Sequence, residues 1–113
     1  MVQRFGVISI LPASIPRHYR SFAAMGVRNR LAGDRALGRG VAELSDKAAT
    51  MAALTETGVA LRDTDGAEAV ILGCAGMAGY RAALEAALGV PVIEPCQAAA
   101  AMAIGRIALA RAP

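Results

Sequence analysis

Cys74 is the residue with the clearest chemical potential, and it lies in a stretch that reads GCAGM. The preceding apolar run, residues 69–72, has the length and β-branched content of a buried strand. Gly73 ends that strand, and residues 76–88 are predicted to form a helix. The thiol is therefore expected where a strand ends and a helix begins, and the free N–H groups at a helix N-terminus favour thiolate over thiol.

The residues around this thiol allow two interpretations. Gly73 and Gly76 carry no side chains, so a ligand is expected to approach the backbone closely beside the sulfur. Alternatively, Cys74 is a small buried hydrophobe, as many free cysteines are. Cys96 follows the next predicted strand and lies at the same sheet edge, where it is either a second thiol or, as we favour, a buried filler at a helix start.

Other kinds of active site find little support in the sequence. His18 is the only histidine, no cysteine pair has ligand spacing, and a metal site is therefore not expected. An exposed or partly packed imidazole is the expectation for His18. Arg81 is one residue too far from Cys74 for a phosphatase-type loop, and no glycine-rich dinucleotide fingerprint follows the first strand. We expect no cofactor.

The elements that must position Cys74 alternate between strands and helices, which indicates a parallel sheet with right-handed crossovers. We predict an α/β fold, a single lobe of roughly four parallel strands flanked by helices and spanning residues 1–113. Strands are predicted at residues 4–11, 36–41, 68–72 and 90–93. Four helices are predicted. The first runs from Ser14 to Met25, and the second from a cap at Ser45 or Asp46 to the turn at residues 63–66. The third covers residues 76–88 and the fourth residues 97–111, with Met102 and Leu109 on the packing side of the fourth.

Composition narrows the functional classes. The 113 residues carry a formal net charge of +3, but the arginines are scattered with little aromatic material among them, so nucleic-acid binding is not expected. Uncharged apolar runs are shorter than the roughly 18 residues that a membrane-spanning helix needs. Two cysteines do not make a disulfide scaffold, and a reducing, cytoplasmic location fits best.

Several separated motifs carry a resemblance to a known family. The sequence reads DGAEAVILGCAGMA at residues 65–78 and LGVPVIEP at residues 88–95, and RFGVISI precedes Ser14-Ile15-Pro16. Together they resemble the second half of enzymes in the aspartate/glutamate/hydantoin racemase superfamily, most of all its hydantoin and allantoin racemase branch. The resemblance covers essentially the whole chain.

The resemblance implies a cofactor-independent isomerase that inverts a carbon next to a carbonyl in a hydantoin or amino-acid derivative. Cys74 matches the second-lobe cysteine that exchanges the α-proton. Gly73, Ala75 and Gly76 match the turn whose amides hold substrate oxygens, and Ser9 matches a hydroxyl-bearing substrate position. Ile10 stands at the next substrate position, where many relatives have Thr.

The resemblance also implies that something is missing. The family places its active site between two similar lobes with one cysteine on each, and only the second lobe is matched here. We therefore expect either a separate first-lobe partner or a homodimer that uses the surface a first lobe would cover. The alternative is a non-catalytic fragment or interaction module derived from the racemase fold.

Overall fold

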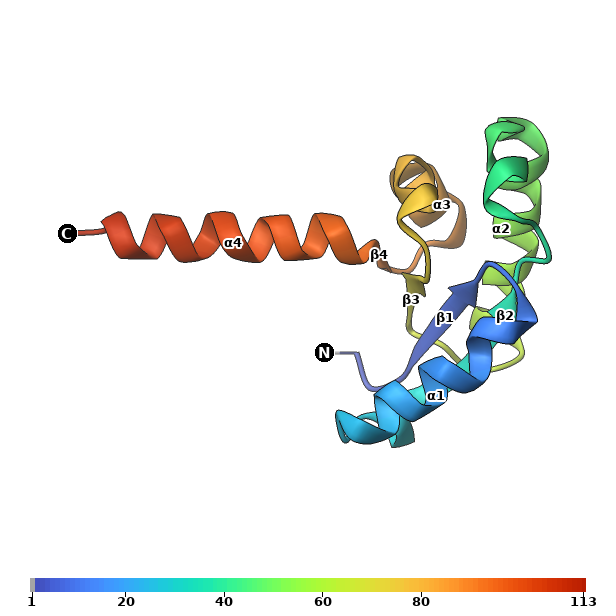
Figure 1. The fold of residues 1–113 in the computed structure, drawn as a ribbon, viewed down its shortest axis with the longest axis horizontal. Coiled ribbons are helices and arrows are strands. Elements are labelled where there is room, and N and C mark those ends of the chain that lie inside the picture. The colour runs from blue at the N-terminus through green and yellow to red at the C-terminus, as the bar shows by residue number, and fades with distance from the viewer. Residues whose placement is uncertain (1) are drawn as a thin grey trace.

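Four parallel strands form one sheet in the order β2-β1-β3-β4 (Figure 1). The computed structural model describes residues 2–113. Its strands are β1 (Phe5–Ser9), β2 (Leu31–Ala36), β3 (Ala69–Leu72) and β4 (Val92–Ile93). The predicted α/β lobe with a four-stranded parallel sheet is thereby confirmed.

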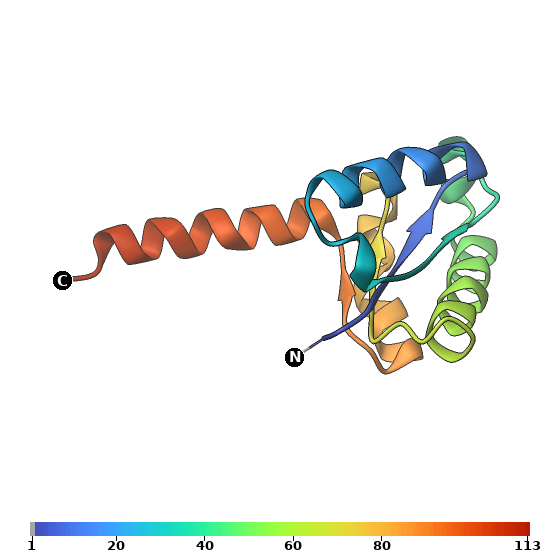
Figure 2. The same cartoon turned by 90° about the horizontal axis from the view of Figure 1, so that it is seen from below.

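Helices cover both faces of this sheet. The α-helices are α1 (Ile15–Ala24), α2 (Lys47–Asp63), α3 (Arg81–Leu88) and α4 (Pro95–Arg111). Short 3-10 helices are η1 (Pro12–Ser14), η2 (Arg28–Arg30), η3 (Val41–Ser45) and η4 (Ala75–Tyr80). Helices α2 and α3 pack side by side on one face, and α1 lies across the other (Figures 1 and 2).

The side chains of β1 alternate between the two faces of the sheet. Successive side chains of a strand point to opposite faces. Ile8 is fully buried in the cluster that includes Leu54 and Leu61 of α2. Phe5 points the other way and meets Phe22 of α1 edge-to-face, with ring centroids 5.3 Å apart. Ser9 shares the face of Phe5, so a polar group at the end of β1 is directed toward α1.

Local signals explain most element ends. The Asp46 side chain accepts a hydrogen bond from the Ala49 N–H and caps α2, as predicted. Gly89 ends α3 in the left-handed region with φ of 70°. Ser14 makes no capping bond, because η1 already leads the chain into α1.

Two predicted elements are wrong in their bounds. The second strand occupies residues 31–36 instead of 36–41, because Gly33 and Asp34 pair with Gly6 and Val7 of β1, although the parallel register shifts once between Phe5 and Gly6. The predicted helix 76–88 is divided: η4 covers its first part and α3 begins only at Arg81.

Helix α4 projects away from the rest of the molecule (Figures 1 and 2). Its 17 residues span about 25 Å, which gives the chain extents of 48 × 31 × 25 Å. Met102 and Leu109 do not pack as predicted: they are 76% and 73% exposed. Among residues 2–113, no helix combines the length and hydropathy needed to span a bilayer.

Candidate functional site

The carboxyl ends of the strands bring the predicted chemical residues to one edge of the sheet. Ser9 is the last residue of β1, Cys74 comes two residues after β3, and Cys96 comes three after β4. Because β1, β3 and β4 are parallel neighbours, these ends lie at the same edge. Ligands of open α/β sheets bind at this edge.

Cys74 occupies the entry to η4. It precedes the first residue of η4 with extended backbone angles, and its side chain is half-buried against the core cluster. The element that follows is a six-residue 3-10 helix instead of the long α-helix that the sequence predicted. A 3-10 helix has poorer hydrogen-bond geometry than an α-helix, and this one gives a shorter run of aligned peptide dipoles.

The turn around Cys74 exposes its backbone, but the two glycines have different neighbours. A Cβ on Gly73 would stand 2.8 Å from the Ile8 carbonyl oxygen and 3.4 Å from Cε1 of His18. A Cβ on Gly76 would stand 3.1 Å from Leu44 and 3.5 Å from the sulfur of Cys74. Both glycines are therefore set in close packing: a Cβ on Gly73 would press on backbone, and one on Gly76 would crowd Leu44 and touch the thiol.

Ser9 and Ile10, the two predicted substrate contacts, are less exposed than a residue that touches a substrate is expected to be. The Ser9 side chain is fully buried, and its hydroxyl donates a hydrogen bond to Oδ1 of Asp34. Ile10 is half-buried and packs against the core cluster. The roles of both residues toward a substrate stay predictions, and Ser9 would have to exchange its present partner to meet one.

A polar cluster that the sequence reading missed stands beside this turn. Nδ1 of His18 lies 2.8 Å from Oδ2 of Asp34 and 3.1 Å from the Ser9 hydroxyl. The Asp34 side chain is fully buried, while that of His18 is 18% exposed. Placing the second strand at residues 31–36 would have revealed it, since Asp34 is then a charged residue inside a strand, paired with Val7 of β1.

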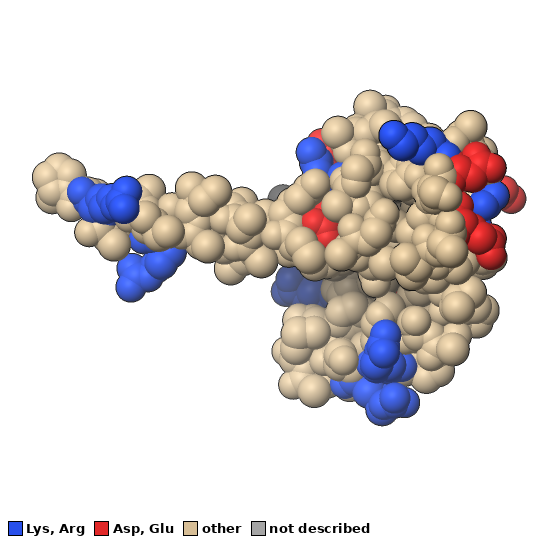
Figure 3. All heavy atoms as spheres, turned by 45° about the horizontal axis from the view of Figure 1, so that its top comes forward, with Lys and Arg blue, Asp and Glu red and all other residues tan. Residues whose placement is uncertain are grey.

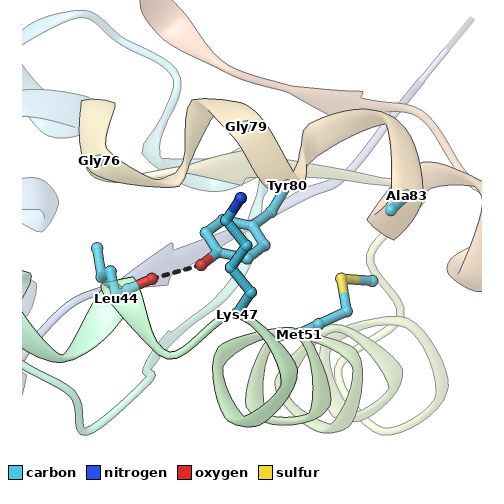
Figure 4. Close-up of a pocket in the computed structure, with 7 residues that line it drawn as sticks. All are labelled: Leu44, Lys47, Met51, Gly76, Gly79, Tyr80 and Ala83. Carbon is cyan, nitrogen blue, oxygen red and sulfur yellow. Dashed lines mark hydrogen bonds between the residues drawn. The ribbon is translucent and has the colours of Figure 1, made fainter.

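A pocket of about 470 Å³ opens next to Gly76 (Figure 4). Its lining is Leu44, Lys47, Met51, Gly76, Gly79, Tyr80 and Ala83. The Tyr80 hydroxyl donates to the Leu44 carbonyl, which joins η4 to η3, and Lys47 of α2 lines the same pocket. The pocket is mostly apolar with one cationic group, and the sequence reading did not single out Lys47 or Tyr80.

Cys96 differs from Cys74 in surroundings. It is exposed, so the favoured interpretation as a buried filler is wrong. The reason is that Cys96 lies in the first turn of α4, and α4 projects away from the body of the protein at this point. The Glu94 side chain accepts bonds from the backbone N–H groups of Cys96 and Gln97, which lowers the pKa of that carboxyl. The charge of Glu94 in turn raises the pKa of the Cys96 thiol.

The described residues were also compared with the requirements of a metal site. Across residues 2–113, no three His, Cys, Asp or Glu side chains gather closely enough to hold a metal ion. The His18 cluster contributes one imidazole and one carboxylate, both already hydrogen-bonded to each other.

Comparison with known proteins agrees with this geometry. The family model described as Asp/Glu/Hydantoin racemase matches residues 1–103. The chain is 37% identical over 106 residues to hydantoin racemase from Paenarthrobacter aurescens, covering 93% of this chain and 45% of that protein. It is 35% identical over 95 residues to hydantoin racemase from Pseudomonas sp. (strain NS671), covering 83% and 38%.

Two solved structures are similar over most of the chain. The crystal structure of allantoin racemase from Pseudomonas fluorescens superposes with a TM-score of 0.83 at 33% identity, covering 96% of this chain and 46% of that one. Allantoin racemase from Klebsiella pneumoniae gives 0.84 at 30% identity, covering 96% and 45%. The chain thus spans about half the length of the relatives it matches.

Proposed function

The chain belongs to the Asp/Glu/hydantoin racemase family, and on that premise we propose that it supplies one half of a cofactor-independent racemase site. Residues 1–113 form one lobe, and Cys74 is its acid–base thiol. The observation that carries the proposal is the place of Cys74: a half-buried thiol at the carboxyl edge of the sheet, beside an exposed glycine turn and an open pocket.

The proposed chemistry is proton transfer at a carbon next to a carbonyl. The Cys74 thiolate takes the α-proton, so the C–H bond breaks, an S–H bond forms and the electron pair moves toward the carbonyl oxygen. The N–H groups of Ala75 and Gly76 begin η4, where a helix leaves its first donors without intrahelical partners. They are the donors proposed to hold the developing negative charge.

The proposed substrate is a hydantoin or another amino-acid derivative, as the names of the relatives suggest. The pocket beside Gly76 is suited to the substrate's side chain, because its lining is mostly apolar and includes Gly76, whose Cβ position lies 3.5 Å from the sulfur. Lys47, which lines the pocket, would favour substrates with an anionic group over neutral ones.

Inversion needs a second acid–base group on the opposite face of the carbon. We infer that this group comes from a first-lobe partner or from a second copy of the chain. What supports this is coverage: the relatives are about twice as long as the segment they share with this chain. The last helix, α4, leaves apolar side chains uncovered, as a surface awaiting such a partner would.

A competing proposal is a non-catalytic interaction module that retains the racemase fold. The exposed apolar α4 is the observation that favours it. The two proposals differ in what Cys74 must do, because a binding module does not need its thiol.

The test is exchange of the α-proton of a 5-substituted hydantoin in D2O, followed by NMR together with optical rotation. A dilute monomer is expected to exchange the proton slowly and to invert poorly, and Cys74→Ser should lower exchange by about 100-fold or more. Cys96→Ser is the matched control and should leave exchange unchanged. Equal exchange by the wild type and Cys74→Ser would exclude the catalytic proposal, and fast, complete inversion by a dilute monomer would exclude the half-site.

A further inference from the structure

Helix α4 lacks the cover that an apolar helix normally has. Residues 99–111 are all exposed, and Met102, Ile104 and Leu109 are 68–76% exposed. Residues 95–105 include no charged residue, so most of the helix has little to gain from contact with water. A helix that is apolar all round is normally buried against other protein surface.

One part of the sheet lacks a helix on one of its faces. Helices α2 and α3 cover one face, while α1 packs on β1 and β2 across the other. Val92 is buried in the core under α2 and α3, so its neighbour Ile93 points to the α1 face. Its partner on β3, Ile71, points the same way.

This surface, which we call the β3–β4 face, consists of Ile71 and Ile93. Ile93 is 40% exposed, and Ile71 is half-buried. Parallel sheets normally carry helices on both faces. The β3–β4 face is therefore a place where one more helix fits, in a molecule that also has one helix without a surface to pack on.

The joint between β4 and α4 holds this helix away from its own sheet. A single residue, Glu94, separates Ile93 from Pro95. The carboxylate of Glu94 is buried and accepts hydrogen bonds from the backbone N–H groups of Cys96 and Gln97, at 3.0 and 2.7 Å. Pro95 fixes the backbone of the first helical position. Turning α4 back onto the lobe would break this cap, so the helix keeps its outward direction (Figure 2).

A second copy of the chain can supply both missing covers at once. Ile93 lies two residues before α4 begins, so the β3–β4 face is at the base of the projecting helix. Two copies related by a two-fold axis can lie antiparallel, and each α4 then crosses the base of the other.

The area of such a contact is that of a stable dimer. Laying one half of a helix about 25 Å long and about 10 Å wide against a neighbour hides about 400 Å² of the helix. With the matching area on the receiving copy and the second helix, the exchange buries about 1,600 Å² in total, and stable interfaces bury about 1,200–2,000 Å².

We propose that two copies of this chain exchange α4, so that the helix of each copy packs on the β3–β4 face of the other. The apolar side chains of α4, among them Met102 and Ile104, meet Ile71 and Ile93 of the second copy. The stretch of α4 before Arg106 carries no charge, so this contact desolvates no ion there. The proposal does not depend on racemase activity: it names the surface through which a second copy binds.

The first test is the dimer dissociation constant, measured by sedimentation on three variants. Ile104→Glu places a charge on the helix, and Ile93→Glu places one on the β3–β4 face. Each should weaken the dimer about tenfold or more, because a charge would be buried without a partner. Val41→Glu is the matched control: Val41 is 65% exposed on η3, outside both surfaces, and its substitution should leave the dimer unchanged.

The outcome for Ile93→Glu distinguishes this exchange from a simpler pairing of the two helices with each other. If the dimer survived Ile93→Glu but not Ile104→Glu, α4 would pair with α4 and the proposal would be overturned. A wild type that stays monomeric at millimolar concentration would overturn it as well. Should a glutamate variant fail to fold by circular dichroism, Ile93→Ser and Ile104→Ser replace the pair and decide in the same way.

The second test follows amide hydrogen exchange of residues 99–111 by mass spectrometry. In the wild type this exchange should be about tenfold slower or more at a concentration where the dimer forms than in a dilute sample. In Ile93→Glu it should be equally fast at both concentrations. Equally fast exchange in the wild type would overturn the proposal. No substrate is used in either test, so their failure would leave the proposed role of Cys74 untouched, and failure of the proton-exchange assay would leave the exchange of α4 untouched.

Discussion

The two thiols of this chain differ chiefly in the charge beside them. The Glu94 carboxylate raises the pKa of Cys96, whereas Cys74 stands at the carboxyl end of β3 beside exposed backbone. We predict that iodoacetamide modifies Cys74 faster than Cys96 near neutral pH, measured on Cys96→Ser and Cys74→Ser respectively. Glu94→Gln should speed the reaction of Cys96, because removing the negative charge lowers the pKa of that thiol. Equal rates for the two thiols would contradict this.

A second prediction at the residue scale concerns Asp65. The Arg35 guanidinium donates to both of its oxygens, at 2.7 and 3.0 Å, and lowers the pKa of Asp65 below its ordinary 3.8. A lowered pKa stabilises the folded chain above the unfolded-state pKa, and this contribution is lost as pH falls through the folded-state pKa. Asp65→Asn should therefore lower the thermal midpoint at neutral pH and weaken its decline in acid.

The control for that measurement is Glu56→Gln, since Glu56 is exposed on α2 and forms no ion pair within residues 2–113. It should leave the pH dependence as it is in the wild type. The same acid decline in Asp65→Asn as in the wild type would show that the Arg35 pair does not link folding to pH.

Between elements, close approach of α2 and α3 depends on one missing side chain. A Cβ on Gly58 would stand 2.6 Å from Cδ1 of Leu88, which is 2% exposed and has little room to move. Gly58→Ala should therefore destabilise the fold by about 1–3 kcal/mol through overpacking, less the gain in helix propensity. Gly105→Ala is the matched helical control, because nothing lies within 4 Å of its added Cβ.

Thermal or urea unfolding checks this pair. A lower midpoint for Gly58→Ala, with no loss for Gly105→Ala, is expected. If Gly58→Ala were as stable as the wild type, α2 and α3 would have to separate more readily than their packing indicates.

The elements also show how far the sequence could lead. The strand at residues 69–72 was predictable because a short β-branched run is bounded by glycine, and α2 because Asp46 caps a periodic apolar pattern. The second strand was misplaced because Gly33 and Asp34 resemble a turn when their pairing with β1 is unknown. The division of helix 76–88 depends on packing of η4 against η3, including the bond from Tyr80 to Leu44, which local propensity does not encode.

The candidate site was predictable only in part, for the same reason. Cys74 and its glycines stand together in the chain, so one motif revealed them. His18 and Asp34 are separated by 16 residues and meet only when α1 and β2 take their places on the sheet. The exposure of Cys96 and of α4 follows from the direction in which α4 leaves the lobe, which the periodicity of the sequence cannot indicate.

At the scale of the whole molecule, α4 is the feature that requires explanation. Met102, Ile104, Ile107 and Leu109 are 52–76% exposed. Figure 3 shows the projecting helix as an almost uncharged surface, with basic side chains only toward its end. A helix that is apolar all round is normally buried, and covering each large apolar side chain contributes roughly 1.5–3 kcal/mol.

We therefore predict that the chain by itself forms a two-fold homodimer through the surface that a first lobe would cover, α4 included. A two-fold interface buries the same patch on both copies, so a single arrangement can cover both α4 helices and bring the two Cys74 thiols to opposite sides of one cleft.

Sedimentation should show a dimer, and Ile104→Glu with Leu109→Glu should dissociate it while the lobe stays folded. Activity should rise with protein concentration, and mixing in Cys74→Ala should lower it more than dilution does. A monomer at millimolar concentration, or a dimer with both sulfurs on outer faces, would leave a separate first lobe as the partner that α4 requires.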